Sequence, residues 1–329
     1  MEDLRENPLV IETTRERDRI SAFIGTSLKS LKRDGAVVGL SGGIDSAVAV
    51  ALCVESLGQD KVIGLLLPER ESNPMSLEYA QKHAARLGIR YECIDITPVL
   101  EKIGTYIKRD EVIRSMFPSY RPDDKIKLSL PADLLARDAL NIYSLSIIRG
   151  EDLVFRSRLT KEQLGSIVAA TNTKQRTRML HLYYWAEKHN YIVCGTTNRS
   201  ELVQGFFVKY GDGGVDIEPL AHLYKTQVYQ LAAALDVPQE IILRPPSPDT
   251  FSKAVSDEEF YFRMPYDRLD PLLWAWERKL TPAEAGKILG LSEDQVIRVF
   301  RDFAAKYRSA QHLLMIPPAL DILPSGGLP

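Results

Sequence analysis

Short apolar runs and helical spacings follow one another along the first hundred residues of the chain. Apolar residues three and four positions apart predict an amphipathic helix between Val10 and Lys32. Continuous apolar runs of the length of buried strands come next, and segments with helical spacing separate them. Because strands alternate with helices, the pattern predicts an α/β fold with a mostly parallel sheet and right-handed crossovers. The predicted strands are Ala36–Leu40, Val62–Leu67 and Ile89–Ile94, and the predicted helices are Ala47–Leu57 and Met75–Leu87.

The pattern changes between about residues 105 and 160. This segment contains Pro118, Pro122 and Pro131, a dense charge cluster at 121–127, and few strand signals. It predicts a partly helical, partly irregular insertion, which would form a lid or an edge of the domain.

The regular pattern resumes with a long helical segment, Lys161–His189, and a further buried strand, Tyr191–Cys194. Helical spacing then predicts a helix at Lys225–Leu235 and a C-terminal helical region over about residues 270–312. Proline and glycine in the tail 316–329 predict irregular structure. We therefore expect one three-layer α/β/α domain over the whole chain, with the insertion and the C-terminal helices attached to it.

Composition excludes several functional classes. The 329 residues are 45% hydrophobic and 26% charged, with a net charge of -2. This profile is typical of a soluble globular protein and predicts no basic surface for nucleic acid or anionic membranes. The N-terminus lacks the apolar core of a signal peptide, and no apolar run is long enough to span a bilayer. Cys53, Cys93 and Cys194 form no paired motif, so we expect three buried thiols and a cytoplasmic protein.

The strongest chemical signal is the sequence SGGIDS at 41–46, between a predicted strand and a predicted helix. Gly42 and Gly43 allow the backbone to approach an anion closely, and the free N–H groups of the following helix face that anion. Two serines add hydroxyl donors. Asp45 would repel a triphosphate unless a magnesium ion lay between them. The loop therefore predicts a phosphate site at the carboxyl edge of the sheet, with a tight turn that binds nothing as the alternative.

This loop has neither the Walker lysine nor the GxGxxG spacing of dinucleotide-binding proteins. It resembles the SGGxDS loop of the ATP pyrophosphatase superfamily, whose members cleave ATP between its α and β phosphates. Later motifs narrow the resemblance to the NAD synthetase family, over roughly residues 20–100 and 165–310. This resemblance implies a fold like that of the adenine nucleotide α-hydrolases. The motifs are NTKQRTRM at 172–179, GTTNRSE at 195–201, GFFVKYGDGGVDIEPL at 205–220, LYKTQV at 223–228 and PPSPD at 245–249.

The resemblance implies roles for individual positions. It assigns catalysis to Asp45, Lys209 and Lys225, and magnesium to Asp45 and Glu201. Basic side chains suit the phosphates and the carboxylate of a dinucleotide substrate. The implied contacts to that substrate are Arg176, Lys209, Asp216 and His312. The implied contacts to ATP are Gly39, Leu40, Ser41, Gly42, Gly43, Ile44, Asp45, Ser46, Thr196, Lys225 and Ser247.

Several of these positions also have a plain structural interpretation. Glu201 could serve only the dipole of a helix N-terminus, and Lys225 could be a solvated lysine at the start of a helix. The glycines at 211–214 could be ordinary turn residues. Arg178 lies two residues after Arg176, so on one helix the two side chains point in different directions.

The implied reaction has two steps and needs no side-chain nucleophile. The carboxylate of nicotinic acid adenine dinucleotide attacks the α-phosphorus of ATP, giving an acyl adenylate and pyrophosphate. Ammonia then displaces AMP and forms the amide of NAD. Only about 40 residues precede the phosphate loop, so we expect free ammonia or a separate glutaminase subunit as the nitrogen source. The resemblance also implies a homodimer with the dinucleotide at its interface.

Three departures from the family pattern leave alternatives open. Residues 252–266 keep Asp257 and Glu258 but lack the Gly-Gln pair and the later glycine of the family's closing loop. His312 has no Lys or Arg beside it, and the insertion is longer than the family needs. A ligase of the same fold that acts on another carboxylate is therefore one alternative. A non-catalytic nucleotide-binding regulatory subunit is another.

Overall fold

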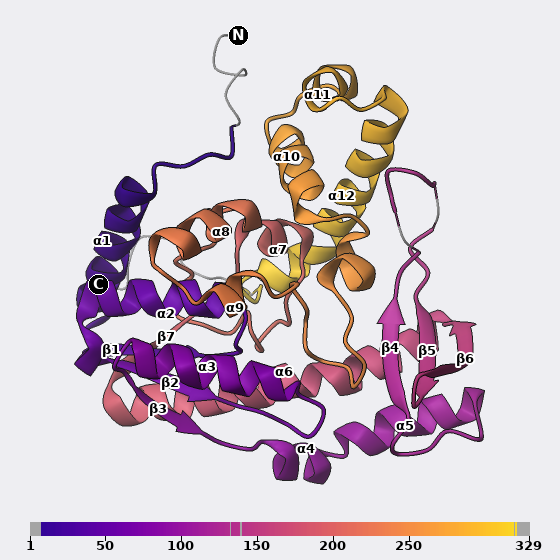
Figure 1. Ribbon diagram of the computed structural model, residues 1–329, viewed down its shortest axis with the longest axis horizontal. Coiled ribbons are helices and arrows are strands. Elements are labelled where there is room, and N and C mark those ends of the chain that lie inside the picture. Colours follow the sequence, from indigo (N-terminus) through magenta and orange to yellow (C-terminus); the bar gives the residue numbers. More distant parts are fainter. Residues whose placement is uncertain (1–7, 132, 139, 319, 321–329) are drawn as a thin grey trace.

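The computed structural model describes residues 8–131, 133–138, 140–318 and 320, and its centre is a four-stranded sheet (Figure 1). The strands stand in the order β3–β2–β1–β7, and each neighbouring pair is parallel. β1 and β2 are buried because they lie between other strands and are covered on both faces. The parallel sheet predicted from the sequence is confirmed. Its strands are β1 Gly35–Gly39, β2 Val62–Leu66, β3 Arg90–Cys93 and β7 Tyr191–Cys194.

Two layers of helices cover this sheet. Successive residues of β1 point to opposite faces, so Ala36 and Val38 belong to one buried cluster and Val37 to another. The first face packs against α1, α2, α3 and α8, and the second against α4, the start of α5, and α6. The result is the expected three-layer α/β/α arrangement. The helices are α1 Thr13–Leu31, α2 Ile44–Leu57, α3 Pro74–Arg86, α4 Thr97–Ile103, α5 Thr105–Met116, α6 Lys161–His189 and α8 Lys225–Ala234.

The insertion at 105–160 differs from the prediction. Its first part is helix α5, but the remainder forms a second sheet, antiparallel and ordered β4–β5–β6. The expectation of loops was wrong because no residue of β6 is fully buried and charged residues flank its apolar run, so β6 lacks the sequence pattern of a covered strand. Hydrogen bonding to β5 holds β6 in an extended conformation that its sequence pattern does not indicate. The strands are β4 Lys125–Ser129, β5 Ser144–Arg149 and β6 Asp152–Arg158.

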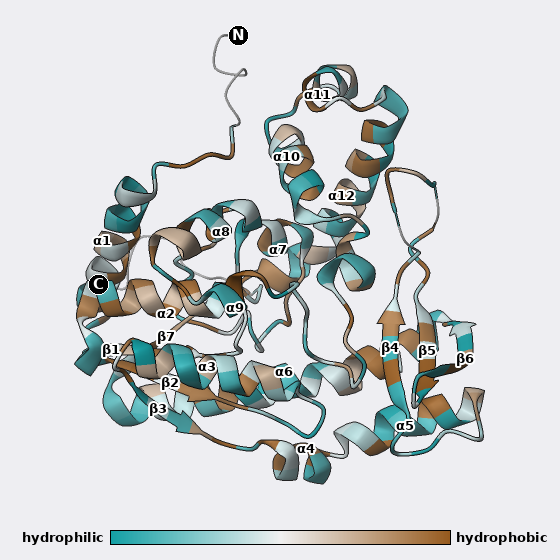
Figure 2. Ribbon diagram, in the orientation of Figure 1, coloured by the Kyte–Doolittle hydropathy of each residue, from teal (hydrophilic) through white to brown (hydrophobic). Residues whose placement is uncertain are grey.

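An apolar cluster holds the second sheet against the rest of the molecule. Ile126 of β4 and Leu145 of β5 pack with Ile113 of α5 and Ile167 of α6. Hydrophobic stretches on β4 and β5 stand out in Figure 2, at the side of the molecule where α5 runs beneath them. The insertion is thus an extension of the domain with its own small core.

The C-terminal region is helical, as predicted. Thr281 and Glu284 form a capping box at the start of α11, and Ser292 with Gln295 forms another at the start of α12. The predicted irregular tail is described only at 316–318 and 320, and the rest of it lies outside the described residues. The remaining elements are η1 Gln59–Lys61, α7 Arg199–Gln204, α9 Gln239–Ile242, the π-helical turn Glu258–Phe262, α10 Tyr266–Glu277, α11 Pro282–Leu289 and α12 Glu293–Leu314.

The cysteines are only partly where the sequence suggested. Cys53 and Cys194 are buried, and their sulfur atoms lie 3.5 Å apart. Cys93 is exposed, so the expectation of a third buried thiol was wrong. The reason is that β3 is an edge strand with little cover. Among the described residues, no helix has the length and hydrophobicity needed to cross a membrane.

Candidate active site

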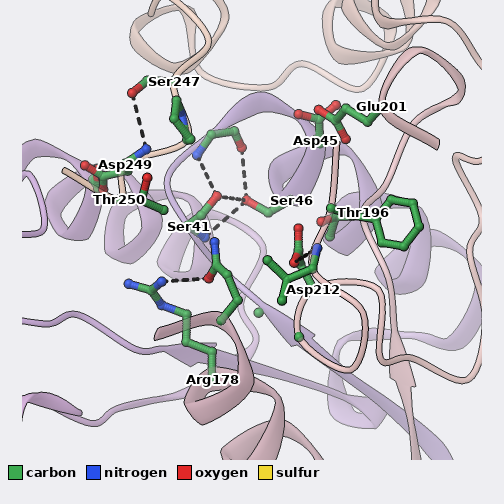
Figure 3. A pocket seen from close by; sticks show the side chains of 18 of the residues that line it. Ser41, Asp45, Ser46, Arg178, Thr196, Glu201, Asp212, Ser247, Asp249 and Thr250 are labelled. Carbon is green, nitrogen blue, oxygen red and sulfur yellow. Dashed lines mark hydrogen bonds between the residues drawn. The ribbon is translucent and has the colours of Figure 1, made fainter. Parts of the chain in front are cut away.

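A cavity of about 590 Å³ opens where the central strands end. Its floor comes from residues at the carboxyl ends of β1, β2 and β7, the edge at which open parallel sheets bind ligands. The phosphate loop forms part of its wall, and α6 forms another part. Residues 205–215 and 244–251 complete the wall, although they are far apart in the sequence. Figure 3 shows Asp45 and Glu201 on one side of Ser41 and Ser46 and the labelled residues of 244–251 on the other.

The phosphate loop is held by its own serines. Ser46 Oγ donates to the carbonyl oxygen of Gly43 at 3.0 Å and accepts from the backbone N–H of Ser41 at 3.2 Å. The hydroxyl of Ser41 accepts from the N–H of Gly43 at 3.2 Å. No side chain caps the first turn of α2, so its N–H groups and the positive end of its dipole face the cavity. This arrangement is suited to a bound phosphate group.

Lys225 lies between two carboxylates beside this loop. Its Nζ donates to Oδ2 of Asp45 at 2.5 Å and is 3.5 Å from Oε1 of Glu201. The amide of Asn198 donates to the other oxygen of Asp45 at 3.0 Å. Asn198 also forms a reciprocal capping box with Glu201 at the start of α7. Glu201 therefore caps a helix, as its structural interpretation expected, and it also faces Asp45 across the lysine.

Burial and neighbouring charges shift the pKa values of the groups around Lys225. Burial, followed by the charge of Asp45, holds the pKa of Glu201 well above its usual range. Burial also raises the pKa of Asp257 to about 6. For Lys225, burial opposes the charged form, but the carboxylates of Asp45 and Glu201 outweigh it and raise the pKa. Three carboxyl groups thus surround one ammonium in a poorly solvated place where their ionisation is costly, so an additional cation would be favoured there.

The donor set fits a magnesium ion that binds together with a nucleotide. Within the described ranges, no three metal-ligating side chains form a cage of their own. Magnesium is commonly held by one or two carboxylates plus substrate phosphates. Asp45 and Glu201, next to an open phosphate cradle, have that composition. Their oxygen atoms are the hard ligands that such an ion requires.

The structure brings most of the predicted ATP contacts into this cavity. Gly42 is the member of the phosphate loop that does not line it: a Cβ there would stand 2.2 Å from the carbonyl oxygen of Ser76. Its φ of +73° also requires glycine. The predicted residues that line the cavity are Gly39, Leu40, Ser41, Gly43, Ile44, Asp45, Ser46, Thr196, Glu201, Lys225 and Ser247.

The four predicted dinucleotide contacts lie outside this cavity. Lys209 Nζ donates to the carbonyl oxygen of His312 at 2.8 Å, and Arg176 Nε donates to the carbonyl oxygen of Lys209 at 3.3 Å. These three residues therefore gather on one exposed part of the surface. Asp216 lies apart from them, where it accepts from the N–H of Val193 at 2.7 Å.

Sequence reasoning missed several residues of the cavity wall. Arg178 lines the cavity while Arg176 does not, which confirms that the two point in different directions. Arg244 and Asp249 approach the phosphate loop from the opposite side, and Tyr143 comes from the insertion. The helical offset between Arg176 and Arg178 was a usable signal. No spacing in the sequence connects Tyr143 or Arg244 with the phosphate loop.

A parallel α/β sheet with an uncapped, glycine-rich phosphate loop at its carboxyl edge defines a nucleotide-binding α/β protein. The family model described as NAD synthase matches residues 16–118 and 131–314. The chain belongs to this family.

Relatives support the same assignment over nearly the full length. The NH3-dependent NAD+ synthetase of Mesorhizobium japonicum is 45% identical over 315 residues, covering 95% of this chain and 98% of the relative. The enzyme of that name from Thermotoga maritima is 40% identical over 262 residues, covering 80% of this chain and 87% of the relative.

Solved structures agree on the fold. An NMN synthetase from Francisella tularensis aligns with a TM-score of 0.66 at 24% identity, covering 95% of this chain and all of the other. An NH3-dependent NAD synthetase from Campylobacter jejuni aligns with a TM-score of 0.61 at 22% identity, with coverage of 95% and 100%. At such identities the likeness concerns the fold alone.

Proposed function

We propose that this protein is an ammonia-dependent ligase that converts nicotinic acid adenine dinucleotide to NAD at the expense of ATP. The observation that carries the proposal is the group formed by Asp45, Glu201 and Lys225 beside the uncapped phosphate loop. Two carboxylates and one ammonium beside the loop are suited to a magnesium ion and the phosphates of ATP, which supports the proposal. Membership of the NAD synthase family supports the choice of reaction.

The two steps follow from the chemistry of a carboxylate and a triphosphate. An oxygen of the pyridine carboxylate forms a bond to the α-phosphorus, the bond to the β-phosphate oxygen breaks, and pyrophosphate leaves. Ammonia then forms the C–N bond to the activated carbonyl carbon, AMP leaves, and one proton is released. The loop amides hold phosphate oxygens, and the ammonium of Lys225 offsets the charge that develops on pyrophosphate. Thr196 and Ser247 add hydroxyl groups to the same wall.

Magnesium completes the proposed site. Asp45 and Glu201 would hold it, and when bound it would neutralise charge on the phosphates and orient them. The three carboxyl groups around Lys225, whose ionisation a further cation would favour, support this assignment.

The dinucleotide contacts are proposed at Arg176, Lys209, Asp216 and His312. Three of these residues gather outside the cavity, which suits a site that a second subunit completes. We accordingly propose a homodimer, with free ammonia or a separate glutaminase as nitrogen source and the cytoplasm as location.

A same-fold ligase with another carboxylate substrate is the second candidate. It is favoured by the departure of 252–266 from the family pattern, because this stretch contributes Asp257, Phe260 and Tyr261 to the cavity wall. A changed wall can change the accepted carboxylate while the adenylation chemistry stays the same.

The test is release of AMP and pyrophosphate from ATP, magnesium and ammonium, with and without nicotinic acid adenine dinucleotide. We expect AMP and NAD in equal amounts, only with the dinucleotide, and a loss on the order of 100-fold in kcat for Asp45→Asn. Asp60→Asn, an exposed aspartate on η1, is the matched control and should leave the rate unchanged. AMP formation with another carboxylate alone would favour the second candidate, and ATP binding without AMP from any carboxylate would contradict both.

A further inference from the structure

Lys174 of α6 is completely buried and uses all three of its ammonium protons. Its Nζ donates to Oε1 of Glu69 at 2.9 Å, to Oε2 of Glu71 at 2.7 Å, and to the backbone carbonyl of Thr250 at 2.9 Å. The exposed fraction of this residue is 0%. An ammonium has three donors, so its position is fully specified by these acceptors.

The carboxylates that bind Lys174 are themselves held by the insertion. Arg109 of α5 donates to Oε2 of Glu71 at 2.7 Å and to Asp110 at 2.8 Å, and it is buried. The hydroxyl of Tyr106 donates to the second oxygen of Glu69 at 2.6 Å. Burial opposes the charge of Glu71, but Arg109 and Lys174 outweigh it and lower its pKa to about 2. Glu71 is therefore charged at neutral pH.

Through Thr250, this cluster reaches the segment 244–251, which we call the strap. All eight residues of the strap line the cavity. Arg244 donates to the carbonyl oxygen of Gly42 in the phosphate loop at 3.4 Å and to Ser76 Oγ at 2.8 Å. Asp249 accepts from the hydroxyl of Ser76 at 2.8 Å. The strap thus crosses from the phosphate loop to α6, and Lys174 holds the α6 end.

The strap has few backbone donors with which to form regular hydrogen bonds. Pro245, Pro246 and Pro248 have no backbone N–H, so three of the eight residues of the strap cannot donate a backbone hydrogen bond. Its position depends instead on the side chains that tie it at each end. Removing the ammonium of Lys174 would free the carbonyl of Thr250 and leave two buried carboxylates in excess.

We propose that Lys174 is a positioning residue for ATP, which sets the strap against the phosphate loop while Arg109 braces it from the insertion. The proposal rests on the proposed use of ATP. It gives α5, the first element of the insertion, a role at the nucleotide site without a contact to the nucleotide.

Steady-state kinetics of Lys174→Met test this role. Because a small displacement of a cavity wall is costly, we expect the KM for ATP to rise roughly 10- to 100-fold. The KM for the dinucleotide and for ammonium should stay near the wild-type values, and kcat should fall by less than the KM for ATP rises. Arg149→Met is the matched control: it breaks an ion pair to the buried Asp124 within the insertion and touches neither the strap nor the cavity.

A second variant separates positioning from stability. Glu71→Gln/Lys174→Met removes one charge of each sign, so it should regain much of the thermal stability that Lys174→Met loses, yet keep the raised KM for ATP because Thr250 still lacks its donor. A normal KM for ATP in either variant, with only a lower Tm, would overturn the proposal. Equilibrium dialysis of ATP with wild type and both variants distinguishes the role of Lys174 from the proposed function. If wild type makes no AMP, the proposed function fails, while equal ATP affinity in all three proteins would refute the role of Lys174.

Discussion

At the scale of single residues, the backbone of the phosphate loop is constrained more tightly than its side chains. Gly42 has a φ of +73°, and a Cβ at this position would stand 2.2 Å from the carbonyl oxygen of Ser76. A side chain at this position meets both a backbone penalty and a collision with backbone atoms that cannot move away easily. The geometry of the loop therefore depends on this residue although it does not line the cavity.

Gly42→Ala should damage both stability and ATP binding. We expect a loss of about 1–3 kcal/mol in the free energy of unfolding and a KM for ATP raised by about 10-fold or more, since the loop must shift away from Ser76. Gly290→Ala is the control, because Gly290 has a φ of +68° with open space around it. It should lose about 1–2 kcal/mol from the backbone alone and keep its activity. Urea denaturation and steady-state kinetics measure the two effects, and equal kinetic constants in both variants would contradict the collision argument.

Glu218 gives the protein a pH-dependent stability. Burial raises its pKa to about 8, while the backbone N–H of Thr197 donates to its carboxylate at 3.1 Å. The folded state therefore prefers the protonated acid. As pH rises from 4.5 towards 8, the unfolded chain ionises this group and the folded chain does not, so stability falls across that window.

Glu218→Gln should flatten this decline. The pKa of Glu218 is raised by 3.5 units, 8 minus 4.5, at 1.36 kcal/mol per unit. The stability that wild type loses at high pH, and that the variant keeps, is therefore at most about 5 kcal/mol. Urea midpoints measured between pH 5 and 9 should therefore converge at low pH and separate at high pH, with the variant more stable. The exposed Glu187→Gln is the control and should follow wild type. Parallel curves for Glu218→Gln and wild type would show that Glu218 ionises as readily in the folded protein as in the unfolded one.

At the scale of elements, local sequence was sufficient where an element is long or completely covered. α6 and β7 begin and end at the residues predicted for them, because a capping box at Thr160 and Asn190 in the left-handed conformation delimit the helix. β6 was missed for the opposite reason. No residue of β6 is fully buried and charged residues flank its apolar run, so only the ladder with β5 shows it to be a strand.

The same difference applies to the elements around the cavity. The phosphate loop could be predicted because the strand, the glycines and the helix N-terminus are adjacent in the sequence. The strap could not, because its position is set by Lys174 and Ser76, which lie about 70 and 170 residues away.

At the scale of the whole molecule, the proposed homodimer has a candidate contact on α6. Leu180 and Tyr184 are 60% and 59% exposed and follow Arg176 at successive four-residue spacings, so the three share one face of the helix. Exposed apolar side chains beside a proposed dinucleotide contact are suited to a subunit interface.

Leu180→Arg/Tyr184→Arg should therefore weaken self-association. Sedimentation velocity should show a dimer for wild type and a larger monomer fraction for the variant at the same concentration, because four like charges would face each other across a two-fold contact. Leu153→Arg, on exposed β6, is the matched control. A variant that stays dimeric places the interface on another face, and a monomeric wild type refutes the proposed assembly.

The sequence alone determined the parallel α/β core, the phosphate loop and the family, because each of these rests on residues that are neighbours along the chain or recur at fixed spacing. Tertiary structure alone decided which distant residues meet. It placed Lys225 between Asp45 and Glu201 and brought the strap to the phosphate loop. The physical reason is that secondary structure follows from local sterics and periodicity, whereas a site at the carboxyl edge of a sheet is assembled from loops whose relative positions depend on packing and buried charge.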